Sequence, residues 1–186
     1  MRIQRIKVIA LLLCATVLSG CSVRGEVEEY VLPEAFPVDF LFYSGAGAWM
    51  TSMVLERDGS FCGEYYDKDM GDCAQAYPYG TMYVCCFSGK FQEIQQIDKY
   101  SYSLTLGEVS SDYQDGKTWI ADGVRYVSSC PYGVEDGKEF ILYLPGTPTE
   151  GLPEEFLNWK KYLGEYSDTL EQYGLYNVDM GYGFFS

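Results

Sequence analysis

The chain of 186 residues contains no histidine. This absence excludes every site that depends on imidazole, including the Ser-His-Asp triad, the Cys-His pair, histidine-ligated zinc and an imidazole general base. Any catalysis would have to use carboxylate, tyrosine, lysine or cysteine side chains. Because no catalytic motif stands out either, the sequence favours a protein that is not an enzyme, and we predict no catalytic residue and no cofactor.

Basic residues are scarce, with 13 Lys and Arg against 27 Asp and Glu, and the formal net charge is −14. Nucleic acid is a poor partner for such a chain and is not expected, because no basic patch could neutralise phosphates. The same charge argues against a body that lies flat on an anionic leaflet. We interpret the negative charge mainly as a source of solubility and mutual repulsion.

Cysteines at metal-binding or redox spacing are absent, since no Cys-x-x-Cys occurs. This excludes thioredoxin-type chemistry and zinc-ribbon spacing. Five cysteines follow residue 21, an odd number, so at least one thiol stays free or pairs between molecules. A Cys62–Cys73 bridge and a fully reduced state both stay open, and we expect mostly reduced, partly buried thiols. The five are Cys62, Cys73, Cys85, Cys86 and Cys130.

The N-terminus has the organisation of a secretory signal. Three basic residues precede an apolar run over residues 8–17 that is too short to span a bilayer. The run leads into Leu18-Ser19-Gly20-Cys21, which resembles the lipobox of bacterial lipoproteins. That resemblance implies cleavage before Cys21, a diacylglyceryl group on its thiol, and a lipid anchor at the extracytoplasmic face of the cell membrane. The alternative is an ordinary secretory signal with an incidental cysteine.

Cleavage would divide the chain into three parts. Residues 1–20 would be the signal peptide, residues 21–37 an acidic tether with two prolines, and residues 38–186 a single β-rich domain. Because the signal holds three basic residues and no acidic ones, the mature chain would carry a net charge of −17. A domain of this length can bury enough apolar surface to fold without metals or disulfides.

Alternation of apolar and polar residues predicts strands along most of the domain. The clearest run begins at Tyr100, and Asp58-Gly59 between two other runs predicts a hairpin. The run over 81–97 is one strand, or two joined by a bulge at Gly89. Expected strands cover 38–43, 49–55, 60–66, 81–97, 100–106, 124–128 and 139–144, and polar loops cover 67–80 and 108–117.

One helix is predicted over residues 152–163. Its apolar positions are Leu152, Phe156, Trp159 and Leu163, with a proline in the first turn, acids at the start and lysines at the end. We expect this helix to dock on the sheet as the closing element of the fold, with Trp159 as its largest buried side chain. Residues 165–173 could form a second short helix. The pattern of the aromatic, glycine-rich tail over 174–186 does not predict where this segment lies in the fold.

These elements predict a mostly β fold, an antiparallel meander of about seven or eight strands closed or half-closed into a barrel, with a C-terminal α-helix. Gly47-Ala48-Trp49 resembles the Gly-x-Trp element of lipocalins, whose barrels hold small apolar ligands and whose helix also follows the strands. Two segments, 44–89 and 144–159, resemble small lipoproteins of Gram-positive anaerobes. The second resemblance supports the surface location and implies no activity.

Three carboxylates lie within six residues of one loop. Asp67 and Asp69 resemble the opening of an EF-hand, and Asp72 follows. The rest of that pattern is absent, because Gly71 occupies the next ligand position and Pro78 the twelfth. We therefore interpret the segment as a solvated turn and expect no metal site.

Aromatic residues are abundant, with 18 Tyr, 10 Phe and 3 Trp. Most should fill the core, but exposed aromatic faces also bind sugars and protein partners. Our candidate binding residues are Trp49, Tyr77 and Tyr79, for a small-molecule, glycan or protein ligand. The predicted function is therefore that of a lipid-anchored binding or interaction module at the cell surface. The alternative is a carboxylate-based hydrolase of cell-wall or other glycans, with Glu64 and Asp67 as candidate acids that no motif supports.

We predict that Cys21 carries the lipid anchor. Cys21→Ala should abolish incorporation of labelled fatty acid and move the protein from the detergent phase to the aqueous phase, because the thiol is the lipid acceptor. Ser22→Ala is the matched control and should stay in the detergent phase. Unchanged processing and partitioning of Cys21→Ala would show that the lipobox interpretation is wrong.

Overall fold

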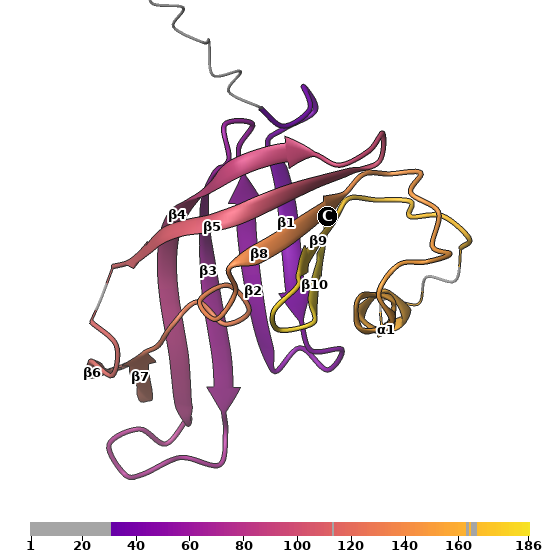
Figure 1. Ribbon diagram of the computed structural model, residues 1–186. Helices are drawn as coiled ribbons and strands as arrows, with labels where there is room; N and C mark the ends of the chain where they lie inside the picture. The colour runs from indigo at the N-terminus through magenta and orange to yellow at the C-terminus, as the bar shows by residue number, and fades with distance from the viewer. Residues whose placement is uncertain (1–30, 113, 163, 165–166) are drawn as a thin grey trace, which may run out of the picture.

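The computed structural model describes residues 31–112, 114–162, 164 and 167–186, so Cys21 lies outside the described residues. The described parts contain ten strands and one helix (Figure 1). The strands are β1 (Val38–Tyr43), β2 (Trp49–Leu55), β3 (Ser60–Asp69), β4 (Thr81–Gln96), β5 (Ser101–Ser111), β6 (Thr118–Ala121), β7 (Val124–Ser128), β8 (Glu139–Tyr143), β9 (Gly174–Asn177) and β10 (Tyr182–Phe185), and the helix is α1 (Glu154–Tyr162).

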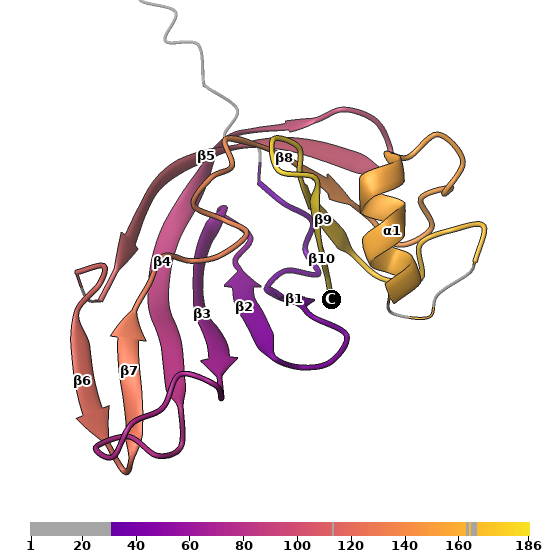
Figure 2. The same ribbon diagram turned by 90° about the horizontal axis from the view of Figure 1, so that it is seen from below.

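Eight of these strands form a closed antiparallel barrel (Figure 2). Their order around the barrel is β1-β2-β3-β4-β5-β8-β9-β10, and a bridge between Leu41 and Phe185 joins β10 back to β1. The barrel is a meander, since neighbours around it follow one another in the chain, with a hairpin inserted before β8 and the helix inserted before β9. The predicted fold class is therefore confirmed.

Large apolar side chains fill the barrel. Alternate residues of each strand point inward, as Phe40 and Phe42 do on β1. An eight-stranded barrel encloses a space that side chains can just fill. Other buried residues of this core are Met53, Leu55, Phe61, Phe87, Phe91, Leu104, Phe140, Leu142, Leu175 and Phe184. These side chains occupy the space in which lipocalins hold their ligands.

The aromatic tail supplies the last two strands of the barrel, β9 and β10. Leu175 and Phe184 belong to the barrel core, whereas Tyr176 and Phe185 face the helix outside. The helix therefore precedes the final two strands. The expectation that it follows all the strands, as in lipocalins, is wrong, and so is the expectation that it closes the fold, because β9 and β10 do so.

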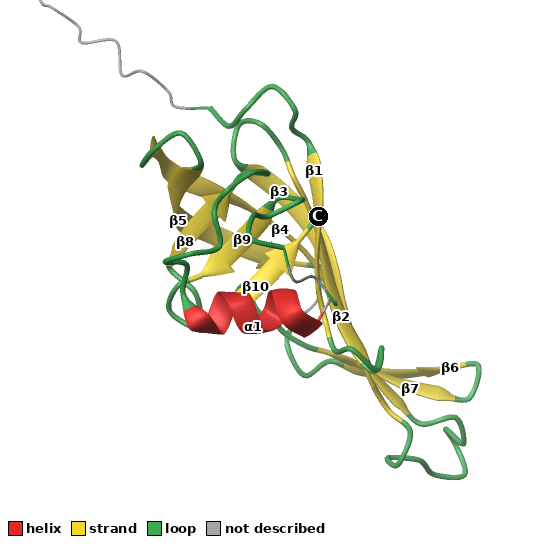
Figure 3. Cartoon of the chain, turned by 90° about the vertical axis from the view of Figure 1, so that its right-hand side faces the viewer, coloured by secondary structure: helices red, strands yellow, loops and turns green. Residues whose placement is uncertain are grey.

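Helix α1 packs on the outer face of β8, β9 and β10 (Figure 3). Phe156 is fully buried there, with its ring 5.1 Å from Tyr143 and 4.9 Å from Phe185. Trp159 is only partly buried; its indole N–H donates to the carbonyl of Gly181 at 2.9 Å. The predicted docking is observed, but Phe156 rather than Trp159 is the fully buried residue. Leu163 lies outside the described residues, and the described residues 167–173 contain no second helix.

The hairpin of β6 and β7 extends the sheet beyond the barrel. β7 pairs in parallel with the start of β4, with Arg125 opposite Thr81, and β6 pairs with β7. Together with the far ends of β3 and β4 and residues 70–80, the hairpin forms an arm that projects from the barrel (Figures 1 and 3). β5 continues to Ser111, which pairs with Phe87 of β4, so the loop predicted over 108–117 begins four residues later than expected.

Residues 31–37 close one end of the barrel, although the tether was predicted to run to residue 37. Leu32 and Phe36 are buried against the core. The backbone N–H of Leu32 donates to the carbonyl of Arg57 at 3.0 Å, and Nε of Arg57 donates back to the carbonyl of Leu32 at 3.1 Å. The two prolines of this segment suggested a linker, but the buried side chains of Leu32 and Phe36 anchor it to the domain.

We predict that the helix contributes to stability mainly through Phe156. Truncation to Ala should lower the free energy of unfolding by about 3–5 kcal/mol, because a cavity adds to the lost transfer energy. Asn158→Ala, on the exposed side of the helix, should change it by less than about 0.5 kcal/mol. Denaturant titrations measure both, and equal midpoints for the two variants would mean that the helix is not docked in solution.

Candidate functional site

Residues 129–138, which we call the mouth loop, close the barrel end that carries Trp49. The loop leads from β7 to β8. Its Tyr132 ring lies 5.1 Å from the ring of Trp49 and 5.6 Å from that of Tyr182, and Val134 is fully buried in the core. This end of the barrel is therefore filled by an aromatic cluster that the mouth loop completes.

Buried hydrogen bonds fix the backbone of the mouth loop. Oγ1 of Thr51 donates to the carbonyl of Tyr132 at 2.7 Å, and Nδ2 of Asn177 donates to the carbonyl of Gly133 at 2.9 Å. Both donor residues are fully buried. Gly133 has φ +91°, and a Cβ there would lie 2.8 Å from the ring of Phe42, so a side chain has no room. These contacts fix the backbone of the loop at Tyr132 and Gly133.

A pocket of about 390 Å³, which we call the mouth pocket, opens between the mouth loop and the second half of β5. The space exists because β8 pairs with β5 only as far as Thr105, while β5 continues to Ser111. The lining residues supply apolar side chains, hydroxyls, two acids and a thiol. They are Leu106, Gly107, Val109, Ser110, Ser111, Asp115, Ser129, Cys130, Pro131, Glu135 and Gly137. A cavity of this size, with a few converging polar groups, suits a small ligand.

Glu135 is the unusual residue of this pocket. Its Oε2 atom is buried and has no hydrogen-bond partner among the described residues. Burial is the main reason why the pKa of this carboxyl is raised, with repulsion from Asp136 in the same direction and backbone N–H groups in the opposite one. A buried carboxylate oxygen without a donor is costly, and such groups are concentrated at functional sites.

The groups near Glu135 on the neighbouring elements are phenols and thiols. Burial raises the pKa of Tyr65 on β3 and of Cys85 on β4 to about 12. Burial and then the charge of Asp115 raise the pKa of Cys130. These groups are neutral at pH 7, so the charge near this pocket comes from its carboxylates.

The structure places the predicted binding residues in two separate groups. Trp49 belongs to the aromatic cluster at the barrel mouth, beside Phe42 at 4.8 Å. Tyr77 and Tyr79 lie on the arm, where Tyr77 lies 4.8 Å from the guanidinium of Arg125 and accepts a hydrogen bond from it. Tyr79 is 64% exposed. Sequence reasoning therefore found one residue of the aromatic cluster under the mouth loop but none of the residues that line the pocket.

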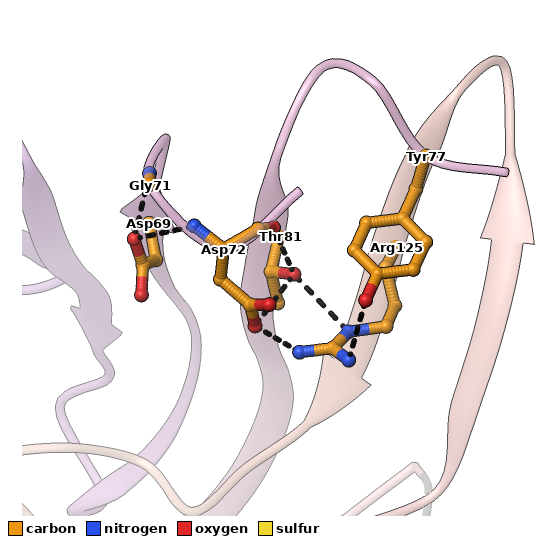
Figure 4. A network of polar contacts seen from close by, with 6 residues as sticks. All are labelled: Asp69, Gly71, Asp72, Tyr77, Thr81 and Arg125. Carbon is orange, nitrogen blue, oxygen red and sulfur yellow. Dashed lines mark hydrogen bonds and ion pairs between the residues drawn. The ribbon is translucent and has the colours of Figure 1, made fainter. Parts of the chain in front are cut away.

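Arg125 organises the acidic loop on the arm (Figure 4). It forms an ion pair with Asp72, which also accepts a hydrogen bond from Oγ1 of Thr81 at 3.1 Å. Oδ1 of Asp69 accepts the backbone N–H groups of Gly71 at 2.9 Å and of Asp72 at 3.1 Å. Asp69 and Asp72 thus hold the turn, and the described residues include no group of three or more acids or cysteines placed to hold a metal ion.

The carboxylates suggested for the alternative hydrolase do not converge. Glu64 and Asp67 are three positions apart on β3, so their side chains point to opposite faces. Glu64 lies on the outer face, where it lines a second concavity of about 560 Å³ over β1 to β4. Asp67 is opposite Trp49 on β2. This pair therefore cannot act together on one bond.

The five described cysteines form no disulfide with one another. Cys85 is buried, whereas Cys62, Cys73, Cys86 and Cys130 are exposed. The expectation of partly buried thiols is wrong for these four, because each lies on an outward face of the sheet or in a loop. Of the exposed thiols, only Cys130 lines the mouth pocket.

Comparisons with known proteins add no family to these observations. No protein-family model matches the chain, and neither a curated protein nor a solved structure matches it. Among the described residues, no helix is long and apolar enough to cross a membrane.

We predict that Glu135→Gln stabilises the protein at pH 7. The raised pKa means that the folded state holds this proton more tightly than the unfolded state. Its contribution to stability is therefore present below about pH 4, the usual range of a glutamate, and is lost as the pH rises through the raised pKa. Denaturant midpoints at pH 4 and pH 7 should show the gain of the variant at pH 7 only.

The exposed residue Glu150, outside the pocket lining, provides the control, since Glu150→Gln makes the same change of side chain and should change the midpoint little. A lower midpoint for Glu135→Gln at pH 7 would mean that the ionised carboxylate is stabilising in the folded state, contrary to this interpretation.

We predict that calcium does not stabilise the arm. Millimolar CaCl₂ should leave the melting temperature unchanged, because Asp69 and Asp72 already accept hydrogen bonds from the protein. The measurement is a thermal melt with and without the ion. A rise of several degrees that disappears in Asp69→Ala would contradict the prediction.

Proposed function

We propose that this chain is a lipid-anchored binding protein of the bacterial cell surface, and that its ligand site is the mouth pocket. The lipobox ending at Cys21 supports the anchor and the location. The observation that carries the binding function is a preformed cavity of about 390 Å³, lined by apolar side chains, hydroxyls and the carboxyl-bearing residues Glu135 and Asp115.

The direction of the chain suits this arrangement. Leu32 packs near Arg57 at one end of the barrel, whereas Trp49 and the mouth loop lie at the opposite end. A protein anchored through Cys21 would direct the end with Leu32 toward the membrane. The mouth pocket would then face away from the membrane, where ligands arrive. The net negative charge would add repulsion from an anionic leaflet.

The rigidity of the pocket walls also favours binding. The mouth loop forms one wall, and the fully buried residues Val134 and Asn177 hold this loop against the core. β5 forms the other wall. A preorganised site gains affinity because little conformational freedom is lost when the ligand binds.

A hydrolase is the second candidate. Its acids would be a different pair from the Glu64 and Asp67 suggested by the sequence. Asp115 and Glu135 line the same pocket, and burial raises the pKa of Glu135. Glycoside hydrolysis needs two carboxyl groups in one site, one of them an acid with a raised pKa. Release of reducing ends from cell-wall glycan by the wild type, and loss of that release in Glu135→Gln, would favour this candidate over binding alone.

The binding proposal can be tested through the thiol in the pocket. In the mature chain, Cys21→Ser, Cys62→Ser, Cys73→Ser and Cys86→Ser leave Cys130 as the only exposed thiol. Small metabolites, lipids and wall-derived glycans are then screened for protection of Cys130 from a maleimide. A ligand of the pocket should slow labelling at least about tenfold when it is present at ten times its dissociation constant.

The matched control keeps Cys62 in place of Cys130, because Cys62 lies on the outer face of β3 and does not line the mouth pocket. Its labelling rate should not change with the same ligand. If no library member protects Cys130, or if both thiols are protected alike, the mouth pocket is not the binding site and the proposal fails.

A further inference from the structure

The composition of the mouth pocket indicates a ligand class. We infer that the pocket takes a small organic cation, with an ammonium group beside Glu135 and Asp115 and an apolar body against Leu106 and Val109. The inference rests on the proposed binding function and deepens it, because it names the chemistry that the same site would recognise.

Charge is the first argument for a cation. Glu135 and Asp115 contribute carboxyl groups, and none of the eleven residues that line the pocket is Lys or Arg. The groups packed around Glu135 from other elements are Tyr65 of β3 and Cys85 of β4, both neutral at pH 7. The mouth loop adds Tyr132, Cys130 and the acid Asp136. An anionic ligand would meet repulsion here, whereas a cation would be attracted.

Hydrogen bonding is the second argument. An ionised carboxylate only accepts hydrogen bonds, and Oε2 of Glu135 has no donor among the described residues. Glu135 lines the pocket, so a ligand there can bring a donor to its carboxyl group. An ammonium group supplies both the donor and the charge, and such charge-assisted hydrogen bonds are the stronger kind.

The shape of the pocket and its other lining residues favour an organic cation over a metal ion. No group of three or more acids or cysteines in the described structure is placed to hold a metal. Leu106, Val109 and Pro131 instead provide apolar surface in a cavity of about 390 Å³. These walls suit a compact hydrocarbon or aromatic body attached to the ammonium group.

Three isosteric probes test the inference: benzylamine, benzyl alcohol and benzoate, which share a ring and differ in charge. Each is titrated calorimetrically into the mature chain carrying Cys21→Ser, at pH 7. Benzylamine should bind at least about tenfold more tightly than benzyl alcohol, since hydrogen bonds to charged groups exceed neutral ones by this much or more. Benzoate should bind least.

Two variants locate the preference. Glu135→Gln should bring benzylamine to within about threefold of benzyl alcohol, because the charge is gone while the size of the side chain is kept. Glu150→Gln removes an exposed charge outside the pocket lining and should keep the preference. Circular dichroism confirms the fold of both variants before titration.

The pH dependence of the benzylamine affinity tests the charge of Glu135 directly, because a purely structural role of this residue would not produce it. The affinity for benzylamine should fall as the pH is lowered through the pKa of Glu135, because protonation of the carboxylate removes its charge. The affinity for benzyl alcohol should stay constant over the same range, and Glu135→Gln should remove the dependence for benzylamine.

The outcomes separate this inference from the proposed function. Equal affinities for benzylamine and benzyl alcohol, tighter binding of benzoate, or no binding of benzylamine at millimolar concentration would each overturn the organic cation. The binding function would still stand if another library member protected Cys130 from labelling. Protection of Cys130 by no ligand overturns the binding function itself.

Discussion

Closure of the barrel by the C-terminal hairpin of β9 and β10 is the constraint on which the rest of the structure depends. The hairpin lies between β8 and β1, which would otherwise be open edges with unpaired backbone groups. Its inward residues complete the packed core, and its outward residues Tyr176 and Phe185 form the surface on which Phe156 docks. Barrel, core and helix are thus joined through eight residues of the chain.

The same hairpin also holds the mouth loop. Asn177, the last residue of β9, donates to Gly133 from a fully buried position. Asp179 in the turn accepts the backbone N–H groups of Lys138 and Glu139 at 2.7 and 2.9 Å, and these hydrogen bonds lower its pKa. The wall of the pocket that carries Glu135 is therefore positioned by the C-terminal residues.

Much of the fold could be predicted because most strands have one face in the core and one in solvent. β1, β2 and the long β4 were recognised in the sequence by their alternation of apolar and polar residues. β4 also has register shifts after Gly89, next to the bulge that was suggested there. β9 could not be recognised from such an alternation. All four of its residues are buried, since the core covers one face and the helix the other, so its sequence cannot alternate in polarity.

The candidate site was less predictable for a related reason. Residues 131–137 read Pro-Tyr-Gly-Val-Glu-Asp-Gly, which is typical of an exposed turn. Only tertiary packing buries Val134 and part of Glu135, and no local pattern signals it. Trp49 was recognised because large aromatics are conspicuous in any sequence, and it does lie at the mouth. Tyr77 was conspicuous for the same reason, but it packs on Arg125 and stabilises the arm.

Hydrogen exchange of the mouth-loop amides tests most directly whether the C-terminal hairpin positions the pocket. Asn177→Ala removes the buried donor to Gly133, and Val178→Ala, at an exposed neighbouring position, is the control. We expect Asn177→Ala to lose protection at amides of residues 129–138 while the amides of β2 and β3 stay protected, and Val178→Ala to resemble the wild type. Unchanged protection in the loop, or an equal loss throughout the barrel, would contradict this account.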